Sequence, residues 1–195
     1  MSDATVTRER SDSTDVSTSE PIAGPGFRAW MDATADRFES ADERRVEVFV
    51  RSMLPPLGVK STQEALIARL DELAADSSLD AVSVTVTGNR LCLCETCAGT
   101  DAERSLLDRI AELDEWGDDH DATASPFFET RDLDSAMADE TARALVPPRV
   151  TAALYCDDAL AGVFPCRIDG QECAVRDFAD ALDRLCEGRQ LVVEP

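Results

Sequence analysis

Residues 79–97 read LDAVSVTVTGNRLCLCETC, with an apolar run on each side of Gly88-Asn89. From Val82 to Thr87, valine alternates with serine or threonine, which is the period of a strand that buries one face. A glycine followed by an asparagine fits the two central positions of a type II′ turn. The stretch therefore predicts a β-hairpin, and pairing across the turn places five aliphatic side chains on its core face: Val82, Val84, Val86, Leu91 and Leu93.

The opposite face of this hairpin carries cysteines, which makes it the main candidate for a chemical site. Cys92 and Cys94 share that face, and Cys94-x-x-Cys97 has the spacing of a zinc knuckle. One interpretation is a zinc site formed by Cys92, Cys94 and Cys97, with a fourth ligand from Cys156, Cys166, Cys173, Cys186 or His120. Cys94 and Cys97 could instead form a redox pair. A third interpretation needs no cofactor, because cysteine also packs as a small apolar residue on a half-buried strand.

Helix and strand patterns continue on both sides of the hairpin. Ser61 with Glu64, and Thr100 with Glu103, form capping boxes that open two amphipathic helices. The predicted elements are a strand at 45–53, a helix at 61–76, the hairpin, a helix at 100–118 and a strand at 127–130. Their order predicts an α+β fold over residues 43–133, a ferredoxin-like split βαβ domain with both helices on one face of an antiparallel sheet.

Residues 134–195 predict a β-β-β-α extension packed on this domain. Asp169-Gly170 is a favourable hairpin turn, Gly188 is a natural helix C-cap, and 191–193 would add an edge strand. The predicted elements are strands at 149–156, 160–166 and 171–175 and a helix at 177–187. Residues 131–148 fit either a linker with a short helix or an irregular edge strand.

The N-terminal part divides into two segments. Residues 1–23 are mostly small, polar or acidic, and this composition predicts a disordered segment. Residues 24–42 predict an amphipathic helix and linker, with four large apolar side chains at helical spacing: Phe27, Trp30, Met31 and Phe38. This stripe either docks on the rest of the chain or binds a partner, which could be another protein or a second copy.

Charge limits the classes of partner. Forty acidic residues stand against nineteen basic ones, the net charge is −21, and Lys60 is the single lysine. An acidic excess spread along the whole chain is typical of proteins from salt-in halophiles, where salt screens the self-repulsion. The same charge disfavours nucleic acid as a partner, since no basic stripe is present. A surface for a cationic partner is the alternative interpretation.

Targeting and catalytic motifs are both missing from the sequence. No apolar run approaches the length of a membrane span and no secretory h-region is visible, which predicts a cytoplasmic protein with reduced cysteines. The single histidine, His120, sits in an acidic turn, and no phosphate loop or nucleophile elbow occurs. We therefore expect a non-enzymatic binding or regulatory module that recognises a protein or a small ligand.

Three segments carry a family resemblance: Arg44 to Pro56, Leu106 to Ser135 and Val146 to Cys166. They resemble a family of small acidic haloarchaeal proteins that are labelled helix-turn-helix proteins. The resemblance covers residues 44 to about 187 and includes the spacing from Trp116 to Phe127-Phe128. It implies a transcription-associated regulator that binds DNA, and it carries over no individual functional residue.

Overall fold

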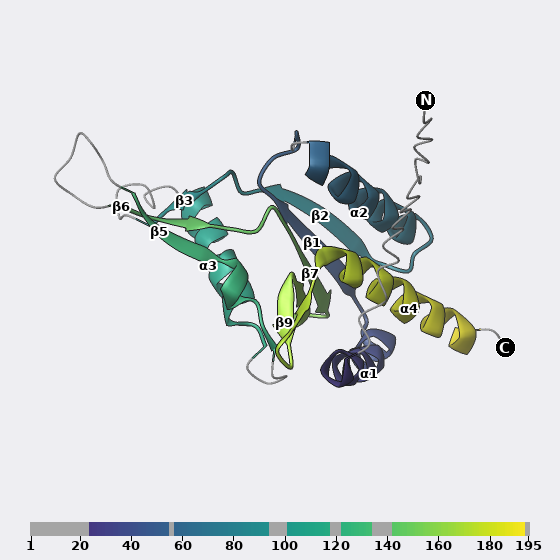
Figure 1. Ribbon diagram of the computed structural model, residues 1–195. Coiled ribbons are helices and arrows are strands. Elements are labelled where there is room, and N and C mark those ends of the chain that lie inside the picture. Colours follow the sequence, from purple (N-terminus) through teal and green to yellow (C-terminus); the bar gives the residue numbers. More distant parts are fainter. Residues whose placement is uncertain (1–23, 55–56, 94–100, 118–121, 134–141, 194–195) are drawn as a thin grey trace, which may run out of the picture.

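A mixed four-stranded sheet lies at the centre of the molecule (Figure 1). The structure is a computed structural model that describes residues 24–54, 57–93, 101–117, 122–133 and 142–193. The strands of the central sheet are β1 (Arg44–Val50), β2 (Ala81–Val86), β7 (Val150–Cys156) and β8 (Ala159–Phe164). Their order is β2-β1-β7-β8, with β1 parallel to β2 and the other two pairs antiparallel.

The core is built around β1, which has a neighbour on each side. Val46, Val48 and Val50 each have an exposed fraction of 0%, and their partners in β2 and β7 are also aliphatic. The alternate residues Arg45 and Glu47 point to the second face of the sheet, because successive side chains of a strand point to opposite faces. The two faces of β1 therefore have different chemistry, because one is apolar and the other carries two charged residues beside the buried Phe49.

Helices cover both faces of this sheet (Figure 1). α2 (Leu57–Ala75) and α4 (Val175–Val193) lie on one side, and α3 (Asp101–Glu115) lies on the other. α1 (Pro25–Ser40) packs against β8 and α4. Each helix buries its apolar stripe, as the spacing of its leucine and aromatic residues predicts. Within the described ranges, no helix combines the length and the apolar character needed to cross a membrane.

Two smaller sheets flank the central one. The first, in the order β3-β6-β5, consists of β3 (Leu91–Cys92), β5 (Glu129–Leu133) and β6 (Ala142–Val146). The second, in the order β10-β9-β4, consists of β4 (Ala122–Thr123), β9 (Cys166–Ile168) and β10 (Gln171–Cys173). A 3-10 turn, η3 (Ser125–Phe127), links β4 to β5. In Figure 1 the β3-β6-β5 sheet extends away from the body beside α3.

The hairpin predicted at 79–97 is wrong. β2 pairs in parallel with β1, and β3 pairs with β6 in a separate sheet, so the two runs do not face each other. Thr87 still donates its backbone N–H to the Val50 carbonyl at 2.8 Å, beyond the last residue of β2. The predicted core face is consequently open, since Val84, Val86 and Leu93 are 37%, 51% and 39% exposed. Alternation shows that a strand has one apolar face, but it does not choose the neighbouring strand.

The α+β class is confirmed. The strands do not divide into a ferredoxin-like domain and an extension, because strands from both predicted parts share one sheet. β7 and β8, which were predicted to belong to the extension 134–195, occupy half of the central sheet. β1, α2 and β2 make a parallel β-α-β unit, and β1 takes β7 as its antiparallel neighbour. The physical reason is that β7, which is buried at all seven positions, gains most by pairing with the buried strand β1.

Several local predictions also change at their ends. α2 begins at Leu57, directly after two prolines, and not at the capping box of Ser61. α4 runs through Gly188 to Val193, so the predicted C-cap and the edge strand at 191–193 are wrong. A glycine weakens a helix by only about 1 kcal/mol, which the packing of the preceding turns can offset. The segment 1–23 lies outside the described residues.

Two turns with positive φ angles contain a glycine. The Asp169-Gly170 hairpin between β9 and β10 is confirmed, with φ of 50° and 75° at the two residues. Gly117, just after α3, has φ of 115°, and a Cβ there would lie 2.4 Å from the Ala122 carbonyl oxygen. Only glycine fits this position, which ends α3 and directs the chain to β4.

Candidate functional site

Glu47 of β1 joins α3 to the central sheet. Its carboxylate accepts hydrogen bonds from Arg109 Nε at 3.0 Å and Nη2 at 2.7 Å, and a third from Arg45. Arg109 also donates to Glu112, one turn further along α3, at 2.6 Å. Hydrogen bonding to Glu47 raises the pKa of Arg109 above its ordinary value, so this guanidinium stays charged.

Two guanidinium groups stack on the ring of Tyr155 in β7. The central carbons of Arg45 and Arg109 lie 4.2 Å and 4.7 Å from the ring centroid. Tyr155 is buried, and burial raises the pKa of its hydroxyl well above the usual value, so the phenol is neutral. A cation over an aromatic face is attracted by the ring quadrupole. This cluster therefore fixes α3, and the sheet beside it, on the charged face of β1.

Four arginines gather where β5 and β6 lead into β7, and we call this group the arginine end: Arg51, Arg131, Arg143 and Arg149. Arg51 donates through Nε to the Pro147 carbonyl at 2.7 Å, and its backbone N–H donates to the Arg149 carbonyl at 3.2 Å. Burial, followed by the charges of Arg149 and Arg131, lowers the pKa of Arg51. The hydrogen bonds of Arg51 to the carbonyls of Pro147 and Arg149 place its guanidinium beside the start of β7.

The two strand arginines of the arginine end each have a carboxylate beside them. Their ion-pair partners are Glu129, 2.5 Å from Arg131, and Asp132, 4.0 Å from Arg143. The register of β5 with β6 places Arg131 opposite Ala144 and Arg143 opposite Asp132, so the two arginines occupy opposite faces of the β5-β6 ribbon. Both are open to solvent, with side chains 63% and 65% exposed.

Several basic residues on other surfaces are also paired with acids. Lys60 pairs with Glu64, Arg69 with Asp183, Arg104 with Asp101 and Arg167 with Glu172. The sequence did not predict the arginine end, because its members come from separate strands and each has acids nearby in the chain. Only the charged residues of the β5 segment, Glu129-x-Arg131-Asp132, could have indicated a charged strand there.

A cleft of about 370 Å³ opens between α2 and α4 on the other side of the sheet. The two helices run in the same direction (Figure 1). Arg69 closes one end of the contact with a 2.7 Å ion pair to Asp183. The cleft is mostly apolar with a few polar groups, and its lining is Ser61, Thr62, Ala65, Leu66, Val175, Arg176, Ala179 and Asp180. It suits a small, largely apolar molecule.

The aromatic stripe of α1 is used inside the chain, which corrects its interpretation as a partner-binding surface. Phe27, Trp30 and Phe38 are 5%, 3% and 1% exposed, and Met31 packs partly against the core. The Trp30 indole N–H donates to the Ala161 carbonyl at 3.0 Å, on the outer edge of β8. Of the two interpretations of this stripe, the structure therefore favours docking on the rest of the chain.

Only part of the predicted cysteine site lies among the described residues. Cys92 lies half-buried in β3, whereas Cys94, Cys97 and His120 lie outside the described residues. In the part of the chain that the structure describes, no three His, Cys, Asp or Glu side chains are grouped to hold a metal ion. Zinc at Cys92, Cys94 and Cys97 and a redox pair at Cys94 and Cys97 stay predictions.

The remaining cysteines lie apart from β3 in the core. Cys156 and Cys186 are separate and buried, and burial raises the pKa of each. Cys166 and Cys173 are cross-strand neighbours in β9 and β10, and they hydrogen-bond to each other. This bond raises the pKa of Cys166 and lowers that of Cys173. None of the four approaches Cys92 as a grouped ligand set.

Comparison with known proteins gives one match. A family model described as a helix-turn-helix domain matches residues 38–187. A search of curated proteins and a search of solved structures both find no match.

The matched region does not contain a helix pair joined by a short turn among the elements described. α1, α2, α3 and α4 are each separated from the next helix by at least one strand. The family description therefore rests on the sequence, and the fold that carries it here is α+β. Because the match spans most of the 195 residues, the chain belongs to this helix-turn-helix domain family.

Proposed function

We propose that this protein is a non-enzymatic regulatory module that acts in transcription and contacts DNA through the arginine end. The observation that carries the proposal is the membership of a helix-turn-helix domain family over residues 38–187. Proteins given that description commonly bind DNA. No helix pair of the expected kind occurs among the described elements, so the proposal uses exposed arginines in place of a recognition helix.

The arginine end has the chemistry that a DNA backbone requires. Arginine binds phosphate oxygens through a planar fork of donors. β5 is an outer strand of the three-stranded β3-β6-β5 sheet, so the contact that we propose is with backbone phosphates along this edge. Arg131 and Arg143 project from opposite faces of the β5-β6 pair, so each face presents one guanidinium to phosphate oxygens. The connection between the two strands, 134–141, lies outside the described residues.

The charge of the whole chain sets the conditions for this contact. A protein of net charge −21 is repelled by DNA over long distances, and added salt shortens the range of that repulsion. Non-specific binding, which depends on releasing counterions, should therefore be weak. We expect selective binding to a limited set of sequences at moderate to high salt.

The first prediction concerns the two ribbon arginines. Replacing both, Arg131→Ala with Arg143→Ala, should weaken DNA binding by roughly 10-fold or more and lower the slope of log affinity against log salt by about 2, because two phosphate contacts are lost. The probe is a random-sequence duplex library, enriched by selection on the full chain and then measured by fluorescence anisotropy from about 0.1 to 1 M KCl.

The matched control removes two arginines from other surfaces. Arg167 lies on β9 and Arg184 is exposed on α4, so Arg167→Ala with Arg184→Ala changes the net charge equally and should leave affinity within about twofold. Equal weakening by both double variants would show a general charge effect and remove the arginine end from the proposal. No enrichment of any duplex by the folded chain would overturn DNA binding itself.

The cleft between α2 and α4 favours a second candidate function, the binding of a small apolar effector. Leu66 and Val175, which line it, are buried, whereas Arg176 and Asp180 stand at its exposed rim. A volume of about 370 Å³ lies in the range of small-molecule pockets. An effector seated there would contact two helices at once and could alter how they pack.

We expect the dye 1-anilinonaphthalene-8-sulfonate to bind the folded chain at one site in this cleft. Ala179→Trp should reduce the dye fluorescence by roughly 5-fold or more, because an indole fills the space between the helices. Ala29→Trp, on the exposed side of α1, adds the same side chain elsewhere and should leave the signal unchanged. Unchanged dye binding by Ala179→Trp, with thermal unfolding as the check on folding, would exclude the cleft.

A further inference from the structure

The two outer strands of the central sheet, β8 and β2, differ in how far they are exposed to solvent. β8 is buried along most of its length, and α1 covers its edge, with Trp30 donating to the Ala161 carbonyl. β2 forms the other edge and has β1 as its one strand partner among the described residues. Four of its six residues are exposed, including Val84 at 37% and Val86 at 51%.

β2 also lacks the features that normally protect an open edge. Natural edge strands carry lysine, proline, a bulge or an inward charge, all of which prevent pairing with another chain. Residues 81–89, AVSVTVTGN, contain none of these and form the longest stretch without a charged residue in the chain. A strand of valine, serine and threonine with no charge is a strong template for strand addition. The β2 edge is therefore suited to pair with a further β-strand.

The backbone groups on this edge are aimed outward in a definite pattern. Thr87 donates its N–H to Val50, on the β1 side. Because N–H and C=O groups alternate sides along a strand, those of Val82, Val84 and Val86 point away from β1. These three residues would each exchange two hydrogen bonds with an antiparallel partner strand.

We propose that β2 pairs antiparallel with β2 of a second copy, across a two-fold axis at Val84. In this register Val84 faces Val84 of the other copy, Val82 faces Val86, and Ser83 faces Thr85. Like side chains meet on each face, so the alternating strand is complementary to itself, as an isologous interface requires. The two central sheets then become one continuous sheet.

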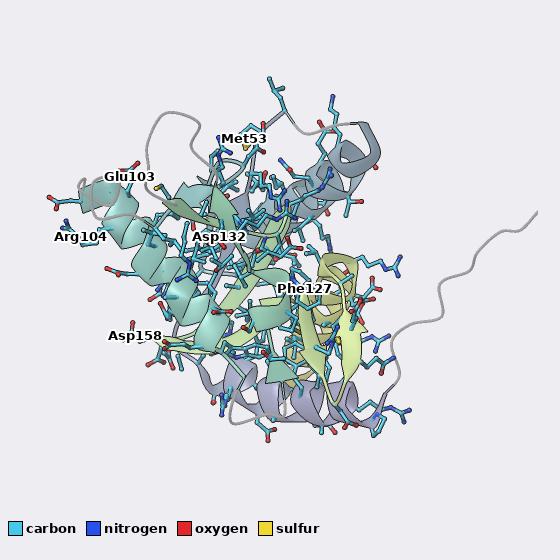
Figure 2. All side chains as sticks on the ribbon, turned by 60° about the vertical axis from the view of Figure 1, so that its left-hand side comes forward. Met53, Glu103, Arg104, Phe127, Asp132 and Asp158 are labelled. Atoms are coloured by element: carbon cyan, nitrogen blue, oxygen red, sulfur yellow. The ribbon has the colours of Figure 1, made fainter. Side chains whose placement is uncertain are left out.

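Charge supports a second copy as the occupant. Two molecules of net charge −21 repel each other, and the uncharged β2 edge is a place where they can approach without opposed carboxylates. Met53 and Leu54, which are 55% and 88% exposed, lie in the connection after β1, at the end of the sheet where β2 also ends. Met53 is labelled near the top of Figure 2.

The salt dependence of the dimer follows from the same charges. At about 1 M salt the screening length is only about 3 Å, so the repulsion between two acidic copies is largely removed. We expect the chain to be monomeric in dilute buffer and dimeric in molar salt at the same protein concentration. Sedimentation equilibrium of the full chain between about 0.2 and 3 M KCl measures this directly.

A charge exchange at Val84 tests the register. Because Val84 is its own partner, Val84→Glu places two carboxylates face to face and Val84→Arg places two guanidinium groups face to face. Each variant alone should dimerise at least about 10-fold more weakly than wild type, and an equimolar mixture should recover a 1:1 heterodimer, seen by native mass spectrometry. Ala159→Glu, on the exposed start of β8, is the matched control and should dimerise like wild type.

Three results would overturn the proposal. The first is a wild-type chain that stays monomeric at every salt concentration. The second is a Val84→Glu variant that dimerises as well as wild type while remaining folded by circular dichroism. The third is a monomer that dimerises only after residues 1–23 are deleted, since the chain's own N-terminal segment would then be the occupant of the edge. The inference does not depend on DNA binding, so either proposal can fail alone.

Discussion

Replacing Trp30 by alanine should destabilise the protein by about 3–5 kcal/mol, because it removes a fully buried aromatic side chain and leaves a cavity. The indole is 3% exposed, and its ring lies 5.5 Å from Phe27 and 5.1 Å from Phe164 between centroids. Its N–H is also the donor to the Ala161 carbonyl, which would lose its partner. Urea unfolding at a fixed high salt concentration measures the loss.

Two further variants separate the contributions of Trp30. Trp30→Phe keeps an aromatic ring but removes the donor, and should cost about 1–2 kcal/mol. Met31→Ala, next along α1 and only partly buried, is the matched control and should cost less than about 1.5 kcal/mol. If Trp30→Ala costs no more than Met31→Ala, α1 is not docked on β8 as described.

The fit of Trp30 depends on Gly162, which lies in β8 below it. A Cβ at position 162 would lie 2.8 Å from the indole Cζ2, so a larger residue would push α1 away from the sheet. This packing explains how α1 covers the edge of β8. α1, which the sequence indicated could either dock on the chain or bind a partner, covers one edge of the sheet.

Removing the carboxylate of Glu47 should destabilise the protein by roughly 2–3 kcal/mol. Glu47→Ala leaves Arg45 and Arg109 over the ring of Tyr155 without the acceptor that holds them together. Breaking a buried ion pair costs about 3–5 kcal/mol, and the cost here is reduced because the side chains of Glu47 and Arg109 are 16% and 29% exposed. Thermal and urea unfolding at several salt concentrations measure the loss.

A double-mutant cycle between Glu47 and Arg109 isolates the interaction. We expect a coupling free energy of about 1–2 kcal/mol from Glu47→Ala, Arg109→Ala and the double variant. Glu172→Ala, which breaks the exposed pair with Arg167, is the control and should leave stability unchanged within error. A cycle with no coupling would mean that Arg109 contributes only through packing on Tyr155.

The Glu47 cluster also links the fold to the proposed DNA contact. α3 is held on the sheet by Arg109, and the β3-β6-β5 sheet lies beside α3 (Figure 1). Loosening α3 should therefore disturb the position of the ribbon that carries Arg131 and Arg143. If Glu47→Ala lowers DNA affinity while Arg131 and Arg143 are unchanged, the result would support the inference that the position of α3 determines the position of these two arginines.

Local patterns were sufficient for most helices and for several strands. The helical spacing of Phe27, Trp30 and Phe38 predicted α1 almost to its ends, and the alternation at 149–156 predicted β7. These elements depend on contacts within a few residues, namely side-chain period and turn chemistry, which are visible in any window of the chain. The Asp169-Gly170 turn was predicted for the same reason.

Pairing between strands was not visible in this way. The valines of β2 fit a hairpin with Leu91 and a parallel pair with β1 equally well, because both arrangements bury one face of an alternating strand. The choice depends on β7, more than sixty residues later, which completes the sheet on the far side of β1. The arginine end was missed for the same reason, since it exists only after β5, β6 and β7 are brought together.

The sequence by itself determined the acidic charge, the secondary-structure elements and the absence of known catalytic motifs, because these properties depend on composition and local periodicity. Only the tertiary structure decided which strands pair, that the aromatic face of α1 is buried, and that β2 has β1 as its one strand partner among the described residues. Those outcomes depend on the packing of segments that are distant in the chain. A valine pattern alone cannot show whether its apolar face will be covered by its own chain or by another.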